Sequence, residues 1–152
     1  MNKVPGTLKL DDYLPYRLSV AANAVSQLIA RAYEDRFRLK VPQWRLIAVL
    51  ADEGALTQQA LCGRTLMDKV TVQRAAQELL RRRLIKRLPN TSDGRSHRLI
   101  LTATGERLYH EIVPLALKYE AQLFDGIDRR EIVRLEQQLR LLQQTAGTLG
   151  RK

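Results

Sequence analysis

One abrupt change of residue pattern limits what this chain can fold into. Up to about residue 83, apolar residues recur at steps of three and four, the period of amphipathic helices. Two short runs rich in Leu and Ile, 84–88 and 97–101, then flank an octapeptide of mostly turn-forming residues, 89–96. The helical period returns from Thr102 onward. We therefore expect a mainly α fold with one small β-hairpin.

Capping residues divide the helical part further. Thr57, Asp68 and Asp128 can each cap a helix start, Pro42 suits a first helical turn, and Gly54 suits a helix end. The first helix is too long for a small domain to bury alone. In order, the expected helices are 12–38, 42–53, 58–62 ended by Gly63, 69–83, one from 102 with Gly105 near its start, and one from 129.

The chain of 152 residues is long enough for one domain with a hydrophobic core. We expect an arm over 1–10 and a single domain over 11–147. No apolar run approaches the length of a membrane span, and the N-terminus lacks a signal-peptide pattern, which predicts a cytoplasmic protein. The single cysteine, Cys62, is either a small buried residue or a redox-sensing thiol favoured by nearby Arg64.

The positive charge gathers in one part of the chain. Net charge is +10, and the segment from Arg64 to Arg98 holds ten Lys and Arg against three acids, which is +7 of that total. Such an excess points to a polyanion, which could be nucleic acid, an acidic protein or an anionic membrane surface.

The helix expected after Asp68 has one apolar face and one hydrogen-bonding face. In the major groove of B-DNA, Arg and Lys bond guanine, Gln bonds adenine, and a Thr methyl can touch thymine. An ordinary solvated helix face is the alternative, but the basic run 81–83 and the adjoining hairpin favour DNA. The groove-facing candidates on this helix are Lys69, Thr71, Gln73, Arg74 and Gln77.

The hairpin tip carries Asp93, Gly94 and Arg95. An Arg beside a glycine can enter a narrow minor groove of high negative potential. Asp93 would instead hold the loop, by an Asx-type bond or by an ion pair with an Arg. Alternatively, both Asp93 and Gly94 serve turn formation only.

These segments resemble the MarR family of bacterial winged helix-turn-helix regulators over about residues 12–147. The resemblance is strongest in 68–74, in Asp93-Gly94-Arg95, and in Leu101-Thr102 with Gly105. It implies that Arg95 is the wing arginine, Asp93 its partner, and Thr71, Gln73 and Arg74 the major-groove and phosphate contacts. Many relatives have Gly where this chain has Arg83, which predicts a slightly different helix exit. With the neighbouring Arg64 and Thr65, the expected DNA contacts are Arg64, Thr65, Lys69, Thr71, Gln73, Arg74, Gln77, Asp93 and Arg95.

The resemblance also implies a homodimer formed by 11–38 and 102–147 around a DNA-binding lobe, 42–101. The seam Ile132, Leu135, Leu139 and Leu142 fits such an interface. The family commonly senses an aromatic carboxylic acid or a phenolic compound, for which the candidates are Tyr16, Arg17, Trp44 and Tyr109. A tryptophan in the position of Trp44 is more often a core residue than a ligand contact, and Arg17 could equally pair with an acid such as Glu111.

Nothing in the sequence suggests a reaction, a cofactor or a metal site. His97 and His110 are separated along the chain, and Cys/His metal spacings and a Gly-rich phosphate loop are both missing. Together with the resemblance to the MarR family, the sequence predicts a ligand-controlled, sequence-specific DNA-binding regulator, and more specifically a repressor that binds a pseudo-palindromic operator. A non-specific basic nucleic-acid-binding protein of architectural type is the alternative.

Overall fold

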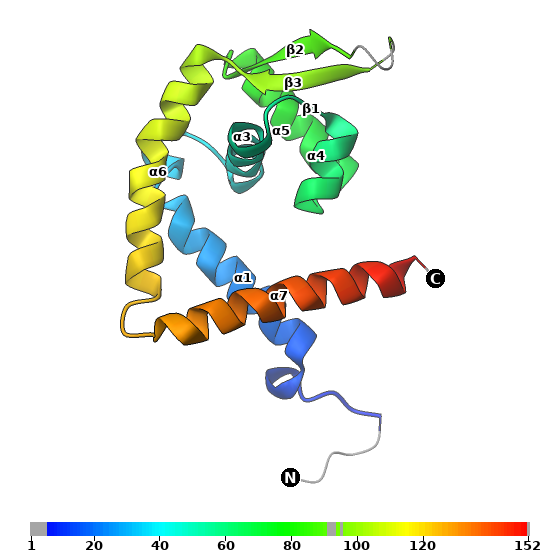
Figure 1. Ribbon diagram of the computed structural model, residues 1–152, viewed down its shortest axis with the longest axis vertical. Coiled ribbons are helices and arrows are strands. Elements are labelled where there is room, and N and C mark those ends of the chain that lie inside the picture. The colour runs from blue at the N-terminus through cyan, green and yellow to red at the C-terminus, as the bar shows by residue number, and fades with distance from the viewer. Residues whose placement is uncertain (1–5, 91–93, 95, 152) are drawn as a thin grey trace. The chain divides into compact units, whose positions relative to one another are not determined.

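The computed structural model describes residues 6–90, 94 and 96–151, and it confirms a mainly helical fold with a small antiparallel sheet (Figure 1). The chain forms two compact units, and the boundary between them falls after Leu117. The elements of the described residues are η1 (Leu10–Asp12), α1 (Leu14–Ala30), α2 (Glu34–Phe37), α3 (Val41–Glu53), β1 (Leu56–Thr57), α4 (Gln58–Thr65), α5 (Lys69–Arg81), β2 (Ile85–Pro89), β3 (His97–Leu101), α6 (Ala103–Leu123) and α7 (Arg129–Gly150).

The core of the first unit lies where α3, α4 and α5 meet the sheet (Figure 1). Helical spacing puts Leu46, Ile47 and Leu50 of α3 on its inner face, and these side chains are at most 2% exposed. Leu61 from α4 and Leu79 from α5 are fully buried in the same core. This packing fixes α5 by one face and leaves its other face to solvent.

The sheet has three strands in the order β1-β3-β2, all antiparallel, where the sequence predicts two. β1 is only two residues long, so it carries no alternating pattern, and Thr57 also caps α4 by accepting a hydrogen bond from the Ala60 N–H at 3.1 Å. β2 is shifted by one residue from the prediction, because Pro89 pairs with His97 at its end.

The prediction of a single helix over 12–38 is wrong, because α1 ends at Ala30. The amides of Arg31, Ala32 and Tyr33 then bond to carbonyls three residues back. Ala30, Ala32 and Tyr33 are each at most 2% exposed. In a straight helix, residues 30 and 32 would point about 200° apart, so one core could not bury both. The tight turn buries both side chains and leads into the short α2.

The end of the third helix is also predicted wrongly, since α4 continues through Gly63 to Thr65. Leu66 ends it instead, with a left-handed φ of 57° and its N–H bonded to the Cys62 carbonyl. α5 ends at Arg81 rather than Arg83, and Arg83 also has a left-handed φ, of 58°. Arg83 therefore occupies a conformation that glycine adopts more readily.

In the second unit, α7 starts where Asp128 predicts, with its carboxylate accepting the Arg130 N–H at 2.8 Å. Among the described residues, none from Val113 to Arg151 is buried. Leu135, Leu139 and Leu142 of the predicted seam are 45–49% exposed. In the described part of the chain, no helix has both the length and the apolar character to cross a membrane.

A close backbone approach at Gly105 generates a stability prediction. A Cβ at Gly105 would lie 2.0 Å from the Leu84 carbonyl oxygen, which already accepts the Thr102 N–H at 3.0 Å. We expect Gly105→Ala to lower the free energy of unfolding by about 3 kcal/mol, through overpacking and damage to that bond. Urea unfolding followed by circular dichroism measures this loss.

Gly63→Ala is the matched control, because Gly63 also lies inside a helix but has nothing within 4 Å of the added Cβ. It should stabilise the fold slightly, by under about 1 kcal/mol. Equal effects of the two substitutions would contradict the steric explanation.

Candidate nucleic-acid interface

The start of α5 is held by its capping residue. Asp68 accepts the Thr71 N–H at 2.8 Å and the Thr71 hydroxyl at 2.7 Å. These bonds, the backbone one first, hold the pKa of the Asp68 carboxyl below its usual value. Because the carboxylate stays ionised, the first turn of α5 keeps its cap at neutral pH.

The opposite faces of α5 differ as the sequence predicts. Val72, Ala75, Ala76 and Leu79 are buried, and the last residue of the predicted stripe, Leu80, is half-buried. Thr71 is half-buried too. The exposed candidates on the solvent face are Lys69, Gln73, Arg74 and Gln77. A polar helix face of this kind, on a helix fixed by its other side, can enter a major groove.

Arg64 and Thr65, at the end of α4, already have intramolecular partners. Arg64 Nε donates to Glu53 Oε1 at 2.6 Å, and this hydrogen bond raises the pKa of Arg64. The Thr65 hydroxyl donates to the Leu61 carbonyl at 2.7 Å and accepts the Met67 N–H at 3.3 Å. Their role as DNA contacts stays a prediction, and Arg64 would have to leave Glu53 to bond a phosphate.

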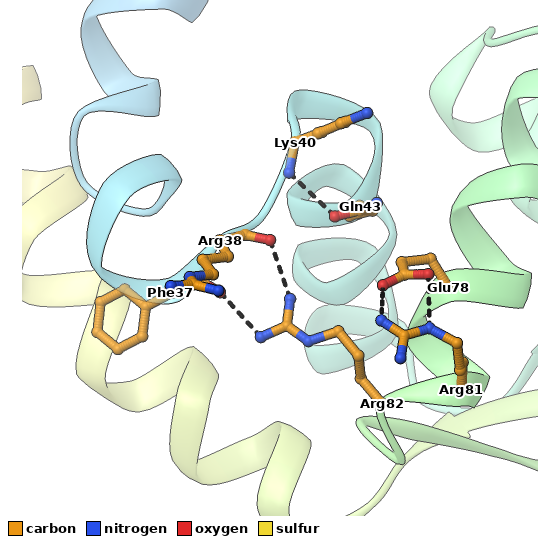
Figure 2. Close-up of polar contacts among 7 residues, drawn as sticks. All are labelled: Phe37, Arg38, Lys40, Gln43, Glu78, Arg81 and Arg82. Atoms are coloured by element: carbon orange, nitrogen blue, oxygen red, sulfur yellow. Dashed lines mark hydrogen bonds and ion pairs between the residues drawn. The ribbon is translucent and has the colours of Figure 1, made fainter.

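Arg81 and Arg82 of the basic run at the end of α5 bond different partners (Figure 2). Arg81 Nε donates to Glu78 Oε2 at 3.0 Å. Arg82 reaches across to the α2–α3 connection, where Nη2 donates to the Phe37 carbonyl at 2.9 Å and Nη1 to the Arg38 carbonyl at 3.0 Å. The sequence gives no signal for this contact, because its partners lie 44 and 45 residues away.

The predicted wing residues Asp93 and Arg95 lie outside the described residues, so their roles stay predictions. At the base of the loop, Asn90 Nδ2 donates to the Ser96 hydroxyl at 2.8 Å. Between this base and the first turn of α4 lies a polar pocket of about 540 Å³, lined in part by Gln58, Arg87 and His97. His97 is exposed on the hairpin and lines this pocket together with Arg87.

The structure brings together two of the four ligand candidates. Trp44 stacks on Tyr109 with ring centroids 5.8 Å apart, and it also stacks on Tyr33 at 5.5 Å. Sequence reasoning missed Tyr33, whose burial raises its pKa to about 12. The third ring follows from the break after α1, which no local pattern shows.

The other two candidates, Tyr16 and Arg17, are exposed near the start of α1. Within the described residues, no ion pair joins Arg17 to Glu111, and no ring contact joins Tyr16 to Trp44. Cys62 is half-buried on α4. In the same part of the chain, no three His, Cys, Asp or Glu residues lie close enough to hold a metal ion.

Capped α5, the adjoining helices and the three-stranded sheet define a winged helix-turn-helix protein. A model of the MarR family matches residues 39–96, which span α3 to the hairpin. Over these residues the chain is similar to the MarR family.

Known proteins are also similar to this chain. The HTH-type transcriptional regulator FarR of Neisseria gonorrhoeae is 36% identical over 70 residues, 46% of this chain and 48% of that protein, so the match spans about half of the curated relative. Bordetella bronchiseptica BpsR, whose DNA binding is regulated by 6-hydroxynicotinic acid, is 25% identical with a TM-score of 0.76, covering 86% of this chain and 98% of that one. A MarR/EmrR family regulator from Acinetobacter sp. ADP1 shares the fold, with a TM-score of 0.84 at 23% identity, over 93% and 99% of the two chains.

The two carbonyl contacts of Arg82 predict a structural role. We expect Arg82→Ala to lower the free energy of unfolding by about 1 to 3 kcal/mol, because charged hydrogen bonds to two carbonyls are lost. Arg82→Lys should restore only part, since an ammonium cannot span both carbonyls as the guanidinium fork does. Chemical denaturation of the three proteins checks both expectations.

Arg81→Ala is the control, because the exposed Arg81 pairs with Glu78, one turn away on the same helix. It should change stability little. The structural role of Arg82 is refuted if Arg82→Ala unfolds at the same denaturant concentration as the wild type.

Proposed function

We propose that this protein is a sequence-specific regulator that binds double-stranded DNA as a homodimer and represses transcription from a pseudo-palindromic operator. The observation that carries the proposal is the polar, solvent-facing side of α5, with Gln73, Arg74 and Gln77 exposed on a helix whose start is capped and whose other face is buried. The basic hairpin beside it supplies phosphate contacts, which give most of the affinity in such complexes.

The dimer is supported by the apolar surface that one chain leaves open. Leu135, Leu139 and Leu142 recur at helical spacing on α7 and are about half exposed, and the adjoining pocket of about 520 Å³ is lined by Phe124, Ile132 and other residues of the second unit. Leu14 and Leu18 of α1 are also exposed. Monomeric proteins rarely leave a regular row of large apolar side chains such as that on α7 open to water, and a second copy is the economical cover.

The function predicts a base-reading role for Gln73. Duplexes selected from a random library should contain two inverted half-sites about one helical turn apart, bound by two chains. Gln73→Ala should lose preference for one base pair in each half-site, at about 1 to 3 kcal/mol per site. Fluorescence anisotropy titrations of the selected duplex and its single-base variants, at one salt concentration, measure this loss.

The matched control is Gln137→Ala, an exposed glutamine of α7 that helical spacing places opposite the apolar seam. It should bind every duplex as the wild type does. A selection that returns no preferred sequence would instead favour a non-specific nucleic-acid-binding protein.

We further propose control by an aromatic carboxylic acid, as BpsR is controlled by 6-hydroxynicotinic acid. Support comes from the half-buried Trp44, which stacks with two tyrosine rings and offers an aromatic ligand a place to stack. A ligand weakens DNA binding only if it prefers a conformation that fits DNA poorly.

Since Trp44 is the single tryptophan, its fluorescence reports on this stack. 6-Hydroxynicotinic acid and related aromatic acids should quench it and weaken operator binding through a coupling of about 1 to 3 kcal/mol. Arg17→Ala should reduce the effect if Arg17 bonds the carboxylate. A panel of aromatic acids that leaves both fluorescence and operator affinity unchanged rejects this class of effector.

A further inference from the structure

Two exposed apolar side chains lie at the start of α5, where folding does not account for them. Leu66 is 72% exposed and Val70 is 54% exposed. Leu66 also adopts a left-handed φ of 57°, which costs a leucine energy that glycine would avoid. A β-branched valine likewise favours a helix less than alanine does. Neither residue is explained by burial or by local backbone preference.

Val70 belongs to the face of α5 that carries the polar candidates. Positions 70, 73, 74 and 77 follow the spacing i, i+3, i+4 and i+7, so they share one side of the helix. Gln73, Arg74 and Gln77 are exposed on that side. Val70 therefore extends this face by one turn toward the helix N-terminus, the part of a recognition helix that contacts base edges.

Thr71, the thymine candidate in the sequence, is oriented for another purpose. Its N–H and hydroxyl both bond the Asp68 carboxylate. Its half-buried side chain lines a pocket of about 480 Å³ together with Arg38, Lys40 and Arg74. Capping therefore holds the Thr71 side chain away from the side of α5 that faces the groove. Val70 is then the apolar residue on that side.

We infer that Val70 contacts the C5-methyl group of a thymine in each half-site and so determines specificity at that base pair. This inference rests on the proposed function and deepens it. The thymine methyl is the apolar group that the major groove offers, and it distinguishes thymine from cytosine. The exposed side chains of Lys69, Gln73 and Arg74 next to Val70 suit a polyanion better than an apolar protein surface.

The test makes two changes, separately and together. One removes the methyl group of a thymine from the DNA, and the other truncates the Val70 side chain of the protein. Each thymine of a duplex selected by the wild type is replaced in turn by deoxyuridine, which keeps the base pair and lacks only the methyl. At one position per half-site, the wild type should bind about fourfold more weakly, as expected for one buried methyl group, and about sixteenfold more weakly with both positions replaced. Val70→Ala should bind the thymine and deoxyuridine duplexes equally.

Val70→Ala should melt at or slightly above the wild-type temperature, because Val70 is largely exposed and alanine favours the helix. Thymines outside the footprint, replaced in the same way, serve as the DNA control. The inference is overturned if the wild type tolerates deoxyuridine everywhere, or if Val70→Ala keeps the full dependence on the methyl group. A selection without any preferred sequence overturns the proposed function itself, which is a different result.

Discussion

The turn that follows α5 is the constraint on which the winged helix-turn-helix unit depends. Thr102 donates its N–H to the Leu84 carbonyl at 3.0 Å and its hydroxyl to the Arg83 carbonyl at 2.7 Å, and it accepts the Gly105 N–H at 3.1 Å. One set of hydrogen bonds therefore joins the end of α5, the two ends of the hairpin strands and the first turn of α6. Gly105 allows this approach because any Cβ would overlap the Leu84 carbonyl. The Leu-Thr-x-x-Gly motif is thus explained by backbone contact rather than by DNA chemistry.

Charge alone does not identify the side chains that meet DNA. The cluster between Arg64 and Arg98 reads from the sequence as one basic surface, but Arg64, Arg81 and Arg82 each have a partner within the chain. Arg82 connects the end of α5 to the α2–α3 connection, so it positions α5 instead of extending the cationic surface. Lys69 and Arg74 stay exposed on α5. Counting every basic side chain in the sequence as a phosphate contact would therefore overestimate the salt dependence of DNA binding.

The two units use apolar residues in opposite ways. In the first unit, helix spacing and strands bury Leu46, Leu79 and Leu99 in one core. In the second, Leu135, Leu139 and Leu142 recur as regularly and stay half exposed. The same periodicity thus yields a core where neighbouring elements cover it and an open surface where they do not. In the proposed dimer, folding of this surface is linked to association.

Sequence by itself determined the mainly helical fold, the caps at Thr57, Asp68 and Asp128, the hairpin and the polar face of α5, because these depend on local spacing and on side chains that bond neighbouring amides. It also placed Trp44 and Tyr109 among the ligand candidates. Tertiary structure decided the break at Arg31–Tyr33, the short β1, the third ring of the aromatic stack, the carbonyl contacts of Arg82 and the exposure of Val70. Each of these depends on partners distant along the chain or on which face of a helix its neighbours cover, and a local pattern holds no information about either.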